Sequence, residues 1–138
     1  MGYKAVLDQA LHGPEAVDLT DAYRKAFDMA GFPFVEGTLV PASFFHIVTF
    51  PYDAGYYGYL WAEAIGDDMF TAFRSGGIFS AEVGRRYREA VLEPGWLVPG
   101  RDRVRQFLGR DPSEAAYLER LGIGGTAGRA AEEPAHST

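Results

Sequence analysis

The sequence contains no cysteine among its 138 residues. It therefore has no disulfide framework, no thiolate nucleophile and no cysteine ligand for zinc. No apolar run approaches the roughly 18 residues that a membrane span needs, and the first residues lack the basic-then-apolar pattern of a secretion signal. We therefore expect a soluble chain in the cytoplasm that has no membrane partner.

Positive charge and histidine are also scarce. Thirteen lysines and arginines against 19 acidic residues give a formal net charge of −6, which disfavours nucleic acid as a partner. Only three histidines occur, and none forms the His-Glu-x-x-His pattern of a helical zinc site. We therefore expect this chain to hold no metal or cofactor of its own. It also lacks a P-loop, a G-x-S-x-G elbow and a G-x-G-x-x-G fingerprint.

What the sequence does contain predicts an all-α fold. Apolar residues make up 47% and aromatic residues 14%, enough for a real core. Helix start and stop signals are frequent, and no segment reads convincingly as a strand. Asp18 is a predicted N-cap for a helix that reaches about Ala30, where Gly31 closes it. Ser80 is predicted to open another helix that runs to about Leu92.

Three shorter helices complete this prediction. One covers about 42–47 and carries His46, and one covers about 101–108 and ends at Gly109. Asp111-Pro112 is expected to open the last, which runs to about Leu121. After residue 123 the composition turns to Gly, Ala, Glu, Ser and Thr without periodicity, so we expect one helical domain over 1–123 and a disordered tail over 124–138.

Residues 52–73 are predicted to form one long central helix. Its apolar residues face all directions, which is typical of a buried helix. Tyr52, Tyr56, Tyr59 and Glu63 recur at steps of four, three and four, which places them along one side. That side is either a row of phenol donors for chemistry or a set of core tyrosines with polar tips. The adjacent Asp67 and Asp68 diverge on a helix and are predicted to be a solvated corner.

The segment Tyr-Asp-Ala-Gly-Tyr-Tyr-Gly-Tyr-Leu-Trp at 52–61 resembles a signature of the zinc metallopeptidases that include thimet oligopeptidase, neurolysin and oligopeptidase A. Shorter matches follow in the same order, from Gly77-Ile-Phe and Glu82-Val-Gly-x-x-Tyr-Arg to Phe107-Leu-Gly-Arg-Asp-Pro and Ala116-Tyr-Leu. The resemblance covers roughly residues 3–123. It implies an all-helical C-terminal part of a catalytic domain and short peptides as substrates.

The resemblance also implies specific roles. His46 matches a histidine thought to contact the substrate and polarise the scissile carbonyl, and Tyr52 matches a loop tyrosine that closes over the substrate. Tyr59 matches the tyrosine that donates a hydrogen bond to the tetrahedral oxyanion. Tyr56 matches a nearby tyrosine that contacts the substrate. A phenol aimed at developing negative charge is an oxyanion-hole element.

In that family zinc is held by an upstream His-Glu-x-x-His helix and a following acidic ligand helix, which this sequence does not contain. One interpretation is therefore a substrate-binding and oxyanion-stabilising segment, inactive until it joins a zinc-bearing upstream polypeptide or associates with itself. The alternative is a non-enzymatic helical module that keeps the scaffold and binds a peptide or protein.

Overall fold

The computed structural model describes residues 1–38, 40–49 and 52–123, and in these ranges it contains helices and no strand. This confirms the all-α prediction. The chain divides into two compact units, Met1–Ala62 and Glu63–Thr138. The tail predicted over 124–138 lies outside the described residues. Within them, no helix is long and apolar enough to cross a membrane.

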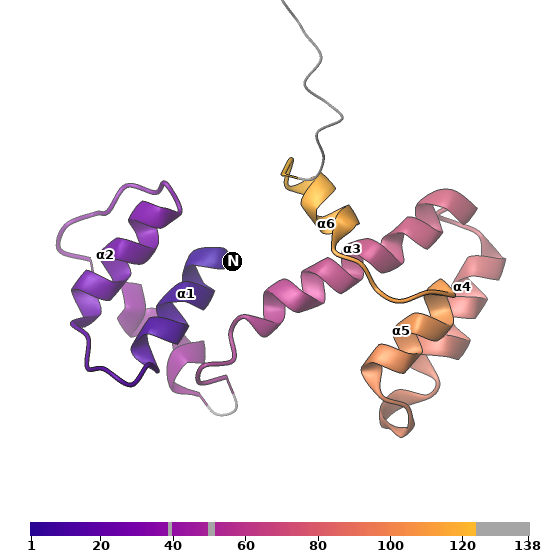
Figure 1. Ribbon diagram of the computed structural model, residues 1–138, viewed down its shortest axis with the longest axis horizontal. Helices are drawn as coiled ribbons and strands as arrows, with labels where there is room; N and C mark the ends of the chain where they lie inside the picture. Colours follow the sequence, from indigo (N-terminus) through magenta and orange to yellow (C-terminus); the bar gives the residue numbers. More distant parts are fainter. Residues whose placement is uncertain (39, 50–51, 124–138) are drawn as a thin grey trace, which may run out of the picture. The chain divides into compact units, whose positions relative to one another are not determined.

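The first unit is built on α1 (Gly2–Leu11) and α2 (Leu19–Met29), which pack side by side (Figure 1). The buried residues of these two helices form the core of the unit: Ala5, Leu7, Ala22, Tyr23 and Ala26. Asp18 caps α2 as predicted, because its carboxylate accepts the backbone N–H of Asp21 at 3.0 Å. Gly31 follows the helix with φ of 70°, which confirms the predicted end of this helix.

Two short 3-10 helices complete the core of this unit. They are η1 (Val40–Ser43) and η2 (Phe45–Val48), where the sequence predicted one helix over 42–47. Phe44 separates them with a non-helical backbone (φ −83°, ψ 74°), which turns its side chain into the core. Phe44 and Ile47 are buried there together with Tyr56.

The second unit contains most of α3 (Gly58–Gly76), followed by α4 (Ala81–Tyr87), the π-helical turn η3 (Arg88–Leu92), η4 (Gly95–Leu97), α5 (Gly100–Leu108) and α6 (Ala115–Arg120). Ser80 caps α4 through the N–H of Val83, and Gly109 ends α5 with φ of 72°, as predicted. Val83, Ala90 and Phe107 form the buried core. α5 packs against η3 (Figure 1).

The prediction of one helix over 52–73 is wrong at its start, because α3 begins at Gly58. Residues 52–57 form turns instead. The reason is a contact from far away in the sequence. The carboxylate of Asp8 accepts the backbone N–H groups of Ala54 and Tyr56, and Ala54 has φ of 58°, which no α-helix contains.

The prediction that this helix is buried is also wrong. Asp68 is its only buried residue, and Trp61 is 65% and Phe70 47% exposed. α3 runs from the first unit into the second, and each core takes only part of it. The first core takes Tyr59 and Leu60, and the second takes Met69, Ala72 and Phe73. Trp61 and Phe70 belong to neither core.

The predicted solvated corner at Asp67 and Asp68 is a third error. Asp68 is 2% exposed and accepts from Arg110 Nη1 at 2.8 Å and from the N–H of Ser113 at 2.8 Å. Asp67 accepts from Arg120 Nε at 2.6 Å. The two side chains do diverge, and each meets its own arginine. The last helix starts at Ala115 and not directly after Asp111-Pro112, as was predicted.

Candidate functional site

The four residues predicted to carry function lie together in the first unit. His46, in η2, stands at the centre of the group. Its ring centroid lies 5.2 Å from that of Tyr52, 5.5 Å from that of Tyr56 and 5.9 Å from that of Tyr59, each in edge-to-face geometry. Such pairs add to the stability gained by burial. We call His46, Tyr52, Tyr56 and Tyr59 the ring cluster.

The three tyrosines also contact one another. The rings of Tyr52 and Tyr59 are nearly parallel, 7° apart, with centroids at 5.9 Å. The ring of Tyr56 lies 4.9 Å from that of Tyr59. Glu63, predicted on the same side of the helix, does not join them. Its carboxylate forms an ion pair with Arg120 at 3.3 Å in the second unit.

The sequence left two interpretations of these tyrosines, as phenol donors for chemistry or as core residues. The structure shows that some are buried and others accessible. Tyr56 is 5% exposed, packs edge-to-face on Phe44 at 4.9 Å and directs its hydroxyl to Met1 Sδ at 3.5 Å. It is a core tyrosine that supports the ring cluster from beneath. Tyr52 is 39% exposed, and His46 and Tyr59 are half-buried. These three rings are the members that a bound molecule can touch.

A shallow hollow lies beside the two stacked tyrosines. It has a volume of about 190 Å³ and is lined by Tyr52, Gly55, Gly58, Tyr59 and Ala62. A Cβ built on Gly58 would have no atom within 4 Å. Gly55 and Gly58 thus contribute only backbone to the wall of this hollow.

The surroundings raise the pKa of the Tyr59 hydroxyl. Hydrogen bonding with Tyr52 is the largest cause, and burial and the charges of Tyr52 and Tyr56 act in the same direction. Tyr59 therefore keeps its proton well above neutral pH. A protonated phenol can donate a single hydrogen bond, to Tyr52 or to an oxyanion that takes its place.

Sequence reasoning missed the residues that hold the turns before α3. Asp8 is fully buried and accepts the N–H of Ala54 at 3.2 Å and that of Tyr56 at 2.9 Å. Gln9 Nε2 donates to the carbonyl of Ala54 at 2.6 Å. The sequence did contain a signal: Asp8 lies three residues after Ala5, on the apolar face of α1. A charged residue on a buried face needs partners, so its position predicts contacts with another segment.

Comparison of the sequence with known proteins shows the family of this chain. The model of peptidase family M3 matches residues 3–123. This chain belongs to peptidase family M3. The resemblance stated from the sequence is thereby confirmed, and M3 is a family of metallopeptidases.

The M3 relatives are much longer than this chain. Thimet-like oligopeptidase of Dictyostelium discoideum is 35% identical over 123 residues, which are 86% of this chain and 18% of the relative. Saccharolysin of Saccharomyces cerevisiae is 44% identical over 81 residues, 59% of this chain and 11% of the relative. Oligopeptidase A of Escherichia coli is 40% identical over 85 residues, which are 62% of this chain and 12% of the relative. This M3 chain spans less than a fifth of the length of these relatives.

The residues of the ring cluster do not fit the zinc site that the resemblance implies for the longer relatives. A protein zinc site needs about three ligands from Cys, His, Asp or Glu. In the ring cluster only His46 is of these types, and the other members are phenols. Across the described parts of the chain, no three His, Asp or Glu side chains gather in a way that would hold a metal ion. The described residues thus supply hydrogen-bond donors and aromatic surface, not a metal centre.

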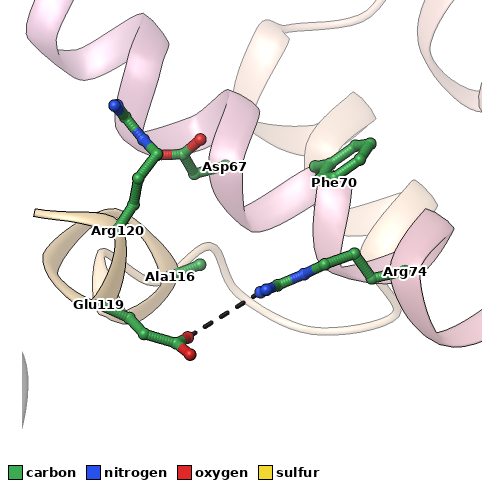
Figure 2. A pocket seen from close by; sticks show the side chains of 6 residues that line it. All are labelled: Asp67, Phe70, Arg74, Ala116, Glu119 and Arg120. Carbon is green, nitrogen blue, oxygen red and sulfur yellow. Dashed lines mark hydrogen bonds and ion pairs between the residues drawn. The ribbon is translucent and has the colours of Figure 1, made fainter.

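A larger hollow of this M3 chain lies in the second unit, between α3 and α6 (Figure 2). It has a volume of about 310 Å³. Arg120 on its wall already pairs with Asp67 at 2.6 Å. Arg74 pairs with Glu119 at 3.9 Å (Figure 2). Both arginines on its wall thus have a carboxylate partner within this unit, and these pairs link α6 to α3. The ring cluster remains the better candidate site.

Proposed function

We propose that this chain is the substrate-binding and oxyanion-stabilising segment of a zinc oligopeptidase that hydrolyses short peptides, and that it is inactive by itself. The observation that carries this proposal is the contact of His46 with Tyr52 and Tyr59, the two tyrosines that line an open hollow. Membership of peptidase family M3 supports it. The zinc site comes from residues outside this chain, on an upstream polypeptide or in an assembly of copies.

Each accessible residue of the ring cluster has a role in this proposal. The Tyr59 hydroxyl donates a hydrogen bond to the oxygen that becomes negative when the scissile carbonyl turns tetrahedral. His46 donates to the same carbonyl in the ground state and polarises it. Tyr52, stacked on Tyr59, closes over the substrate. Tyr56 was expected to contact substrate, and its buried ring supports the other three from the core.

The alternative is a non-enzymatic helical module that binds a peptide or protein. One observation favours it. Two large apolar side chains of α3, Trp61 and Phe70, are exposed, and exposed apolar side chains are suited to contact with a binding partner. In this alternative the hydroxyl of Tyr59 has no role, since a packing surface needs only the ring.

Complementation with the Tyr59→Phe variant separates these functions. The zinc-bearing part of a relative such as oligopeptidase A is co-expressed with this chain, and cleavage of a fluorogenic short peptide is measured. Tyr59→Phe keeps the ring and removes only the hydroxyl. Losing one oxyanion donor typically lowers kcat about 10²–10³-fold, roughly 3–4 kcal/mol, so we expect the loss in kcat more than in KM.

The matched control is Tyr57→Phe. Tyr57 lies two residues away, and its side chain is 49% exposed and outside the ring cluster, so kcat should stay within about twofold of the parent. Equal effects of the two variants would show that Tyr59 acts as core only. Absence of cleavage with a complement that binds the chain would favour the non-enzymatic module.

The cytoplasmic location expected from the sequence stays a prediction. Fractionation of the source cells, followed by detection of the chain with an antibody, tests it directly.

A further inference from the structure

A buried carboxylate on α1 holds the backbone of the turns that carry Tyr52 and Tyr56. The Asp8 side chain has no exposed surface, and its two oxygens accept from different residues. Oδ1 accepts the N–H of Ala54 and Oδ2 accepts the N–H of Tyr56. A buried carboxylate is tolerated only when such donors replace water. Hydrogen bonds of this kind, to a charged acceptor, are also stronger than those between neutral groups.

His12 completes the arrangement on the α1 side. Its Nδ1 lies 3.1 Å from Asp8 Oδ1 and 2.9 Å from the backbone carbonyl oxygen of Asp8. Because a carbonyl oxygen only accepts, Nδ1 carries a proton and donates. The imidazole thus donates to the backbone of Asp8 and lies in contact with the carboxylate, which accepts two N–H groups from the turns.

The backbone that Asp8 holds is strained. Ala54 has φ of 58° and is the one non-glycine residue with positive φ in the described ranges. Residues with a Cβ adopt that conformation only when their surroundings impose it. α1 contacts both polar groups of this residue, since Asp8 accepts its N–H and Gln9 donates to its carbonyl at 2.6 Å.

The held turns connect directly to the start of α3. The N–H of Tyr59 donates to the carbonyl of Tyr56 at 3.1 Å, and the N–H of Gly58 donates to that of Gly55 at 3.0 Å. We infer that Asp8 is a positioning residue, whose buried carboxylate sets the backbone from Ala54 to Tyr56 and thereby the placement of Tyr52 and Tyr59 beside His46. The effect of this placement on catalysis rests on the proposed function. A donor contributes fully only when its placement is fixed in advance by supporting contacts.

The test is Asp8→Asn in the full chain, observed by NMR. An amide of the same shape presents one NH₂ where a carboxylate oxygen now accepts, so one backbone N–H loses its partner. Below the melting temperature, we expect the variant to lose the nuclear Overhauser contacts of the His46 ring with Tyr56 and Tyr59. A merely structural Asp8 would lower Tm and leave these contacts intact in the folded state. That result would overturn the inference.

Asp68→Asn is the matched control, because it makes the same change at a buried carboxylate of the second unit. It should lower Tm and keep the His46 contacts. Should Asp8→Asn fail to fold, Asp8→Ser provides the test, because one hydroxyl oxygen replaces the two carboxylate oxygens that accept the N–H groups of Ala54 and Tyr56. The folded variant should lose the same contacts of the His46 ring, and unchanged contacts would overturn the inference.

The inference and the proposed function fail in different ways. If Asp8→Asn displaces the rings but Tyr59→Phe does not affect cleavage in the complemented peptidase, positioning holds and the oxyanion role fails. If Tyr59→Phe lowers kcat but Asp8→Asn leaves the rings and kcat unchanged, the oxyanion role holds and positioning fails.

Discussion

Two buried carboxylates carry out similar tasks in the two units. Asp8 holds turns of the first unit through backbone N–H groups. Asp68 holds the segment after α5 through Arg110 and the N–H of Ser113. In each case the partner lies more than 40 residues away in the sequence, Tyr56 for Asp8 and Arg110 for Asp68. Each carboxylate thus joins two segments that are distant in the sequence.

Asp68 makes the stability of the second unit depend on pH. Hydrogen bonding to the Arg110 guanidinium lowers the pKa of Asp68, aided by the N–H of Ser113 and opposed by burial. A carboxyl group whose pKa is lowered by folding stabilises the folded state above its unfolded pKa of about 4. This stabilisation is lost as pH falls through the lower folded value. Thermal unfolding between neutral and strongly acid pH should therefore show Tm falling below about pH 4.

The variant Asp68→Asn tests the source of that effect. At pH 7 we expect a loss of roughly 1.5–3 kcal/mol, because hydrogen bonds to a charged group are broken, and the difference from the parent should shrink in acid. Asp67→Asn is the control, since its arginine partner is half-exposed and such pairs contribute about 0.2–1 kcal/mol. A difference between Asp68→Asn and the parent that does not change with pH would contradict this account.

At the scale of the elements, local signals predicted the helices and distant contacts changed them. Asp18, Ser80 and Gly109 act through backbone groups within three or four residues, so the sequence around them was sufficient. The start of α3 was not predictable in this way. The tyrosines of residues 52–57 have the spacing of a helix face. Asp8 and Gln9, more than 40 residues away, bind the backbone of this segment in turns.

Substitution of glycines in α3 compares two effects on stability, the packing of an added methyl group and the helix propensity of alanine. Gly76 closes α3 where α4 approaches, and a Cβ built there would lie 2.6 Å from Val83 Cγ2. Val83 is buried in the second core and has little freedom to move. We expect Gly76→Ala to destabilise the chain by about 1–3 kcal/mol in urea unfolding, as overpacked core sites do.

Gly66→Ala is its matched control in the same helix. A Cβ at Gly66 would meet no atom within 4 Å, so only helix propensity changes. Alanine is favoured over glycine there by up to about 1 kcal/mol. The two substitutions should therefore change stability in opposite directions. A stabilising Gly76→Ala would show that Val83 can move aside.

At the scale of the whole chain, the residues of the candidate site could be predicted from the sequence, but their exposure could not. His46, Tyr52, Tyr56 and Tyr59 lie within 14 positions of each other, and the motif at 52–61 indicated the group. Which tyrosines are accessible was not predictable, because that depends on Phe44 and Met1 covering Tyr56. Nor was the exposure of Trp61, since a sequence pattern does not say how much of a helix the chain itself can cover.

The exposed apolar residues lead to a prediction about the isolated chain. Trp61 is 65% exposed, and Phe79, Trp96 and Leu97 are each more than 90% exposed. Exposed apolar surface on this scale is typical of interfaces, and the M3 relatives are at least five times as long as the part matched here. We expect the purified chain to bind a hydrophobic dye and to dimerise or associate further in sedimentation experiments. Trp61→Ser should reduce both signals if α3 carries the contact, and Trp96→Ser should do so if η4 does. A monodisperse parent chain that binds no dye would refute the prediction and show that these side chains need no partner.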